Sequence, residues 1–146
     1  MGDFRELSPT MLASPQIWPD EVATAAALGV RLIINNRPDG ESPDEPQGPA
    51  IEAAARAAGV DYVAIPVSHA GFSLPQVEAM GEALANAGGK VLAYCRSGTR
   101  STFLWAMAQA ETGMEPDAIA AAAASAGYDI TPVRPTVDML AAQAKG

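Results

Sequence analysis

The sequence predicts a single α/β domain with a central, mainly parallel sheet of four to five strands flanked by helices. Three observations support this fold class. The length of 146 residues suits one domain. β-Branched apolar runs alternate with helix-like stretches, which is the pattern of a parallel sheet with right-handed crossovers. No internal repeat or low-complexity linker divides the chain. We therefore expect residues 1–146 to form one domain.

The first half of the chain predicts two helices and two strands. Residues 7–16 are short and turn-rich, and allow an edge strand. Pro19 suits the first turn of a helix that ends at Gly29. The nearly continuous apolar run at residues 30–36 predicts a buried parallel strand. A loop with four prolines follows at residues 37–49, and a helix is expected at residues 50–58.

The second half of the chain continues the alternation. Residues 61–67 predict a strand whose pairing ends at Pro66, because proline removes a donor from the ladder. Ser73 and Gln76 form a capping-box pattern for a helix at residues 74–87. The last strand is expected at residues 90–95, and helices at residues 101–111, 116–126 and 135–144. Ligands bind beyond the carboxyl ends of parallel strands, so residues 35–39, 67–72 and 95–101 should converge on one site.

Composition excludes several classes of function. The chain carries 17 acidic and nine basic residues, a net charge of −8, which disfavours nucleic acid as a partner. No apolar run reaches the roughly 20 residues of a membrane span, and the N-terminus does not resemble a signal peptide. Cys95 is the one cysteine and His69 the one histidine, so we expect no disulfide, metal site or cofactor. The lone thiol favours a cytoplasmic location.

The segment that carries chemistry runs from Cys95 to Thr102. It leaves a strand and enters a helix, where backbone N–H groups and the helix dipole favour an anion. We expect an anion-binding loop made of Arg96, Ser97, Gly98, Thr99 and Arg100. The same groups stabilise a thiolate, which would make Cys95 a nucleophile near neutral pH. Ser101 or Thr102 would donate a hydroxyl hydrogen bond to it. The alternative is an inert, buried cysteine at a strand end.

The loop resembles the active-site loops of two enzyme families. Its pattern is Cys-x-x-Gly-x-Arg-Ser, with Cys95 and Arg100 separated by four residues. Cysteine-dependent phosphatases of the dual-specificity type place five residues between these two. Rhodanese sulfurtransferases commonly have the shorter loop Cys-Arg-x-Gly-x-Arg-Ser. The local loop therefore looks rhodanese-like.

The rest of the chain resembles one family more specifically. The strings at residues 14–17, 33–41, 65–67, 93–101 and 126–129 are similar to the phosphatase-like domain of β-lactamase-hydrolase-like proteins. The resemblance implies a cysteine-phosphatase-like fold of the dual-specificity type. Some members are labelled phosphatases and others sulfurtransferases. In some the domain is fused to a metallo-β-lactamase-type domain, so the resemblance also suggests a partner protein of that type.

The general acid of an ordinary phosphatase has no clear equivalent. Residues 68–71 contain no Asp, and Tyr94 stands where a His usually precedes the nucleophile. Three side chains on the converging loops are candidates for the acid: Asp39, Glu41 and His69. The alternatives are a solvated acidic loop and a surface histidine. Two more residues are expected to support the site. Asn36 would hydrogen-bond the loop backbone, and Arg37 would add positive charge or pair with Asp39.

Three functions remain open from the sequence. The first is a phosphatase-type hydrolase in which Cys95 attacks a phosphomonoester and forms a phosphocysteine. The second is a sulfurtransferase that carries a persulfide on Cys95. The third is a non-enzymatic module that binds a small anion. The substrate in each case is a small anion with a phosphoryl group or a sulfane sulfur.

Overall fold

The computed structural model describes residues 3–68 and 70–145. Its centre is a five-stranded sheet with the order β1-β2-β5-β3-β4. The strands are β1 (Arg5–Ser8), β2 (Met11–Ser14), β3 (Val30–Asn35), β4 (Asp61–Ala64) and β5 (Lys90–Tyr94). Only the pairing of β1 with β2 is antiparallel; β2, β5, β3 and β4 run parallel. The predicted α/β class with a mainly parallel sheet is confirmed.

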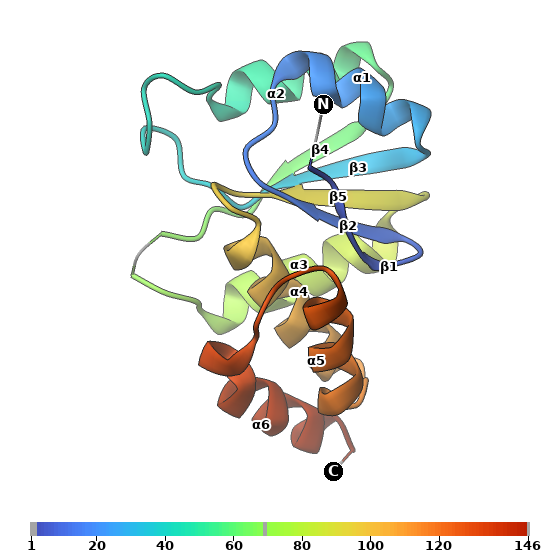
Figure 1. The fold of residues 1–146 in the computed structure, drawn as a ribbon, viewed down its shortest axis with the longest axis vertical. Coiled ribbons are helices and arrows are strands. Elements are labelled where there is room, and N and C mark those ends of the chain that lie inside the picture. The colour runs from blue at the N-terminus through green and yellow to red at the C-terminus, as the bar shows by residue number, and fades with distance from the viewer. Residues whose placement is uncertain (1–2, 69, 146) are drawn as a thin grey trace.

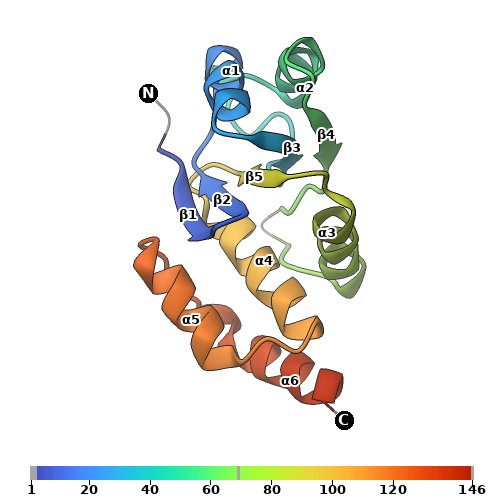
Figure 2. The same ribbon diagram turned by 90° about the vertical axis from the view of Figure 1, so that its right-hand side faces the viewer.

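Helices cover both faces of the sheet (Figures 1 and 2). α1 (Pro19–Ala27) and α2 (Gly48–Ala57) lie on one face. α3 (Leu74–Asn86) and α4 (Thr99–Glu111) lie on the other, with α5 (Pro116–Ser125) and α6 (Arg134–Lys145) packed outside α4. A short 3-10 turn, η1 (Thr131–Val133), precedes α6. Within the described ranges, no helix is long and apolar enough to span a membrane.

Two apolar cores follow from the alternation of side chains along the strands. On β3, Leu32 and Ile34 join the core beneath α3 and α4, while Ile33 joins the core beneath α1 and α2. On β5, Ala93 faces the first core and Tyr94 the second. The central strands are buried on both sides, which explains why their sequences read as continuous apolar runs.

The N-terminal segment differs from the expectation of an edge strand. It forms a hairpin whose second strand, β2, lies between β1 and β5. Of these two hairpin strands, β1 alone lies at an edge of the sheet. The strand predicted at residues 61–67, which is β4, also ends earlier than expected, at Ala64 rather than near Pro66. The amides of Ile65 and Val67 still donate to the carbonyls of Asn35 and Asn36.

The register of the sheet positions the site. Ser14 and Asn35 both lie opposite Tyr94, and Asn35 also lies opposite Ala64. The four parallel strands therefore end at the same level. The next residues along each strand, including Cys95 after β5, meet at this edge, as the sequence predicts.

Candidate active site

Cys95 lies at the base of a tight loop between β5 and α4. Its side chain is fully buried, and its Sγ accepts a hydrogen bond from the Gly98 amide at 3.1 Å. Gly98 is the N-cap of α4, so the positive end of the helix dipole also points toward the sulfur. These groups stabilise negative charge at Sγ. The role of Cys95 as a nucleophile stays a prediction.

Gly98 is required by the turn. Its φ of +92° lies in the left-handed region, which glycine occupies at no steric cost. A Cβ at this position would lie 2.1 Å from the Oη of Tyr128. The Ser97 and Thr99 hydroxyls bond each other at 2.9 Å on the exposed side of the loop, while the Arg96 carbonyl accepts the Gln16 amide.

Arg100 stands on the first turn of α4 and is held at three points. Its Nη1 donates to Glu41 Oε2 at 2.8 Å and to the Val67 carbonyl at 2.6 Å. Its Nη2 donates to Glu41 Oε1 at 2.9 Å. These bonds use three of the five N–H groups of the guanidinium. The edge formed by Nε and the second Nη2 hydrogen takes part in none of them, and it is a fork suited to a tetrahedral anion.

Glu41 and Cys95 both raise the pKa of Arg100. The hydrogen bond to Glu41 is the main cause that raises the pKa of Arg100, against the opposing effect of burial. The Coulombic interaction with Cys95 raises this pKa further. Arg100 is therefore held by Glu41 on one side and lies within electrostatic reach of Cys95, and its binding of an anion stays a prediction.

Glu41 is not a general acid. It accepts hydrogen bonds from Arg100 and from Arg37 Nε at 2.9 Å. The Arg100 bond, opposed by burial and aided by Arg37, lowers the pKa of Glu41 to about 2. The carboxylate is thus ionised at neutral pH and has no proton to give to a leaving group. The sequence-based suggestion that it acts as the acid is corrected: Glu41 orients Arg100.

Arg37 is a buried anchor of the same loop. Its Nη1 donates to Glu45 at 2.5 Å and to Gln16 at 2.9 Å. It pairs with these groups and with Glu41, not with Asp39 as the sequence suggested. Asn36, predicted to bond loop backbone, donates to the Ile65 carbonyl at 2.9 Å.

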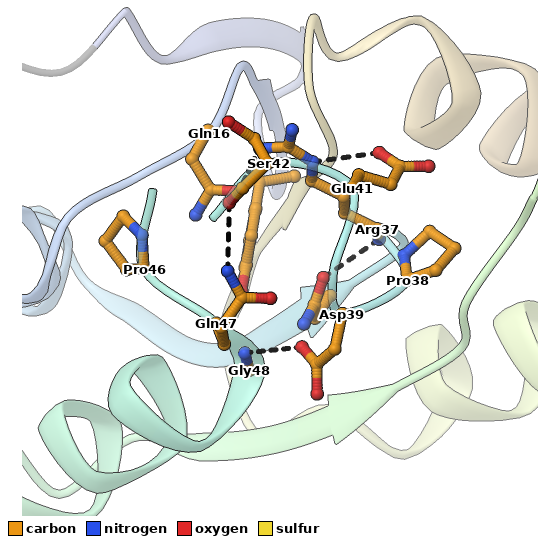
Figure 3. A pocket seen from close by; sticks show the side chains of 11 residues that line it. Gln16, Arg37, Pro38, Asp39, Glu41, Ser42, Pro46, Gln47 and Gly48 are labelled. Carbon is orange, nitrogen blue, oxygen red and sulfur yellow. Dashed lines mark hydrogen bonds and ion pairs between the residues drawn. The ribbon is translucent and has the colours of Figure 1, made fainter. Parts of the chain in front are cut away.

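Asp39 points toward the start of α2 (Figure 3). Its Oδ1 accepts the Gly48 amide at 2.7 Å, which satisfies one of the free N–H groups at the helix N-terminus. This gives Asp39 a structural partner, and its role as a general acid stays a prediction. His69, the third acid candidate, lies outside the described residues.

A small polar pocket separates the Arg37 loop from the end of β5 (Figure 3). Gln16, Arg37 and Tyr94 line it, together with Gln47. Among the described residues, Arg37 Nη2 and Tyr94 Oη are buried without a hydrogen-bond partner. The accessible volume of about 10 Å³ matches one water molecule, which would satisfy such donors.

The two hydroxyls after Arg100 have different surroundings. Thr102 Oγ1 donates to the Gly98 carbonyl at 2.8 Å, so it braces the loop and does not bond the sulfur. This corrects the suggestion that Thr102 is a donor to the thiolate. Ser101 is fully buried, and its Oγ has no partner among the described residues. Its donation to a reacting sulfur stays a prediction.

Two contributors to the site were missed by the sequence analysis. Gln16 bonds Arg37, and its one signal is its place in the string at residues 14–17. Tyr128, which follows α5, donates its hydroxyl to the Ser97 carbonyl at 3.1 Å. Its one signal is its place in the string at residues 126–129. Over residues 3–68 and 70–145, no cluster of three His, Cys, Asp or Glu side chains is suited to a metal ion.

Comparisons with known proteins agree with this geometry. Residues 3–112 match the family described as "Beta-lactamase hydrolase-like protein, phosphatase-like domain". A β-lactamase hydrolase-like protein of Xylella fastidiosa (strain Temecula1) is 36% identical over 86% of this chain. The chain spans only 29% of the length of that curated relative.

Solved structures share the fold. A candidate phosphatase from Neisseria meningitidis is 32% identical, with a TM-score of 0.83 over 94% of this chain and 98% of its own. PTPMT1, at 16% identity, has a TM-score of 0.72 over 97% of this chain and 98% of its own, and shares the fold alone.

Proposed function

The chain belongs to the family of the phosphatase-like domain of β-lactamase hydrolase-like proteins, and from this premise we propose that it is a cysteine-dependent phosphatase-type hydrolase. One observation carries the proposal. The Gly98 amide donates to Cys95 Sγ at 3.1 Å, while Arg100 on the first turn of α4 is held by Glu41 and the Val67 carbonyl through three of its five N–H groups. A nucleophile and an anion fork are thus combined at one helix N-terminus.

The proposed reaction has two steps. The Cys95 thiolate attacks phosphorus and forms an S–P bond, and the ester P–O bond breaks so that its oxygen leaves with the electron pair. Water then attacks the phosphocysteine, the S–P bond breaks, and phosphate and the thiolate are released. Loop amides and the edge of Arg100 that does not bond Glu41 or Val67 would hold the oxygens of the phosphoryl group in both steps.

The substrates that we propose depend on which group can protonate the leaving oxygen. Glu41 is ionised, and Asp39 is engaged at α2. Because neither carboxyl is free among residues 3–68 and 70–145 to give this proton, we propose that the leaving oxygen departs as an anion, which favours aryl phosphates and other good leaving groups over alkyl phosphates. We therefore propose phosphomonoesters of acidic hydroxyl groups as the substrate class.

Sulfur transfer is the second candidate, favoured by the contacts that engage Glu41 and Asp39 and by the four-residue spacing between Cys95 and Arg100. The thiolate would attack the sulfane sulfur of thiosulfate. An S–S bond forms on Cys95, the S–S bond of thiosulfate breaks, and sulfite leaves with the electron pair. Sulfite needs no proton to depart. A thiol acceptor would then remove the sulfur from the persulfide.

The first experiment is hydrolysis of p-nitrophenyl phosphate by the wild type and by Cys95→Ser, with no metal added. We expect turnover that disappears in the variant, and a phosphoryl mass adduct on Cys95 after rapid quenching. A series of aryl phosphates should slow steeply as the leaving hydroxyl becomes less acidic. Absence of turnover, with a persulfide formed on Cys95 from thiosulfate, would replace this proposal by sulfur transfer.

A further inference from the structure

One peptide group links Tyr128 to the reactive sulfur. The peptide joins Ser97 and Gly98. Its carbonyl accepts the Tyr128 hydroxyl at 3.1 Å, and its N–H donates to Cys95 Sγ at 3.1 Å. No described peptide bond is cis, and in a trans peptide the N–H and C=O point in opposite directions. Tyr128 and the sulfur therefore lie on opposite sides of the same peptide plane.

Tyr128 is itself fixed on several sides. It is buried, with 8% of its surface exposed, and its amide donates to the Ala123 carbonyl at the end of α5. The Arg5 guanidinium lies over its ring, 5.4 Å from the centroid, and Arg5 Nη1 donates to the Ala126 carbonyl at 3.2 Å. The N-terminal strand and the segment after α5 thus hold the phenol against the back of the loop.

The peptide between Ser97 and Gly98 depends on this contact for its orientation. Glycine has a broad conformational range, so Gly98 by itself does not prevent rotation of the peptide that precedes it. If the peptide turned, the N–H would leave Sγ and the carbonyl oxygen would approach a thiolate. A hydroxyl that donates to the carbonyl opposes this rotation. It also polarises the peptide, because hydrogen bonds in a chain strengthen one another.

We propose that Tyr128 is a positioning residue for the nucleophile: its hydroxyl fixes and polarises the peptide between Ser97 and Gly98 so that the Gly98 amide holds Cys95 as a thiolate. This inference rests on the proposed function, because it assigns Cys95 the role of nucleophile. Among residues 3–68 and 70–145, Arg100 lies within electrostatic reach of the sulfur and Glu41 pairs with Arg100. They remain unchanged when the Tyr128 hydroxyl is removed.

The test is a titration of the thiol in Tyr128→Phe, followed by the ultraviolet absorbance of the thiolate. Cys95 is the one cysteine in the chain, so Cys95→Ser supplies the blank. Burial raises the pKa of Tyr62, Tyr94 and Tyr128 above the ordinary value for tyrosine, which separates their ionisation from that of the thiol. Absorbance needs no access to the buried sulfur and no substrate.

We expect Tyr128→Phe to raise the midpoint of the thiol titration, with a roughly three- to tenfold fall in the acid dissociation constant of the thiol. The upper figure is close to the low end of the range for a hydrogen bond to an ion, as expected if the bond from the Gly98 amide is weakened rather than replaced. The phenylalanine ring still packs under Arg5, so the fold should persist. Tyr62→Phe is the matched control, because its hydroxyl bonds Asn35 at 2.9 Å and not the loop; it should titrate as the wild type does.

A second measurement protects the test against misfolding of the variant. Replacing the tyrosines by 3-fluorotyrosine makes the hydroxyl a stronger donor, and the midpoint should then fall rather than rise. An unchanged midpoint in folded Tyr128→Phe, beside a depressed wild-type midpoint, would overturn this inference and leave the proposed function standing. A wild-type midpoint at the ordinary value of about 8.5 would overturn the proposed function and this inference with it.

Discussion

Replacing Glu41 by Gln should weaken the fold in a way that depends on pH. The side chain is 18% exposed and lies between two guanidinium groups, those of Arg37 and Arg100. Glutamine keeps the shape and an acceptor oxygen but removes the charge. Both arginines would then lose a carboxylate partner, and only Arg37 would keep another, in Glu45.

The magnitude follows from the pKa of Glu41. It is lowered from 4.5 to about 2, chiefly by the hydrogen bond from Arg100. Each unit corresponds to about 1.4 kcal/mol, so the charged form stabilises the folded chain by about 3 kcal/mol. Because the folded pKa is depressed, this contribution is complete above about pH 5 and is lost as the pH falls through the window down to about 2.

Urea unfolding at several pH values checks this prediction. The difference in unfolding free energy between wild type and Glu41→Gln should be about 3 kcal/mol at neutral pH and about 1.5 kcal/mol near pH 3. Glu52→Gln is the control, because Glu52 forms an exposed pair with Arg56. Its effect should stay within about 0.5 kcal/mol at every pH.

Two results would refute the reasoning. A difference that stays constant between pH 3 and pH 7 would mean that the charge of Glu41 is not what stabilises the fold. A difference no larger than that of Glu52→Gln would mean that Glu41 and its two arginines behave like an exposed surface pair.

Three further predictions concern the loop and its neighbours. Gly98→Ala should destabilise the fold by about 2 kcal/mol or more in urea unfolding and abolish turnover, because its Cβ would lie 2.1 Å from Tyr128 Oη; full activity would contradict the loop geometry. Arg100→Lys should lower kcat/KM about a hundredfold, because an ammonium group is not a planar fork; wild-type kinetics would remove Arg100 from anion binding. Asp39→Ala should cost about 1 kcal/mol through the lost Gly48 bond, whereas a hundredfold fall in kcat would identify Asp39 as the acid.

The sequence predicts the centre of the fold well because each central strand is an apolar run that can be identified without knowing its partners. The run from residue 30 and the run from residue 90 are apolar on both faces, and each strand ends within one residue of its expected bound, at Asn35 and at Tyr94. The hairpin is different. β2 pairs with β5, about 80 residues further along the chain, and no local pattern in four residues encodes such a partner.

The candidate site also has one part that the sequence predicts and another that it does not. The order of residues from Cys95 to Arg100 predicts the anion loop because strand, turn and helix are consecutive in the sequence. The partner of Arg100 could not be predicted, because the loop at residues 37–47 has no periodicity. Its path decides that Glu41 meets the guanidinium while Asp39 meets Gly48. The polar partners of a nonperiodic loop are set by tertiary contacts.

The contact between Arg5 and Tyr128 has a consequence for choosing boundaries when the gene is truncated. The family match ends at residue 112, before α5 begins at Pro116. A shortened chain that stopped there would keep every residue from Cys95 to Arg100 and would still be classified in the family. It would lose the phenol behind the Ser97 carbonyl and expose the apolar side of α4 that α5 and α6 cover. The segment needed to express a working site is therefore longer than the segment needed to recognise one.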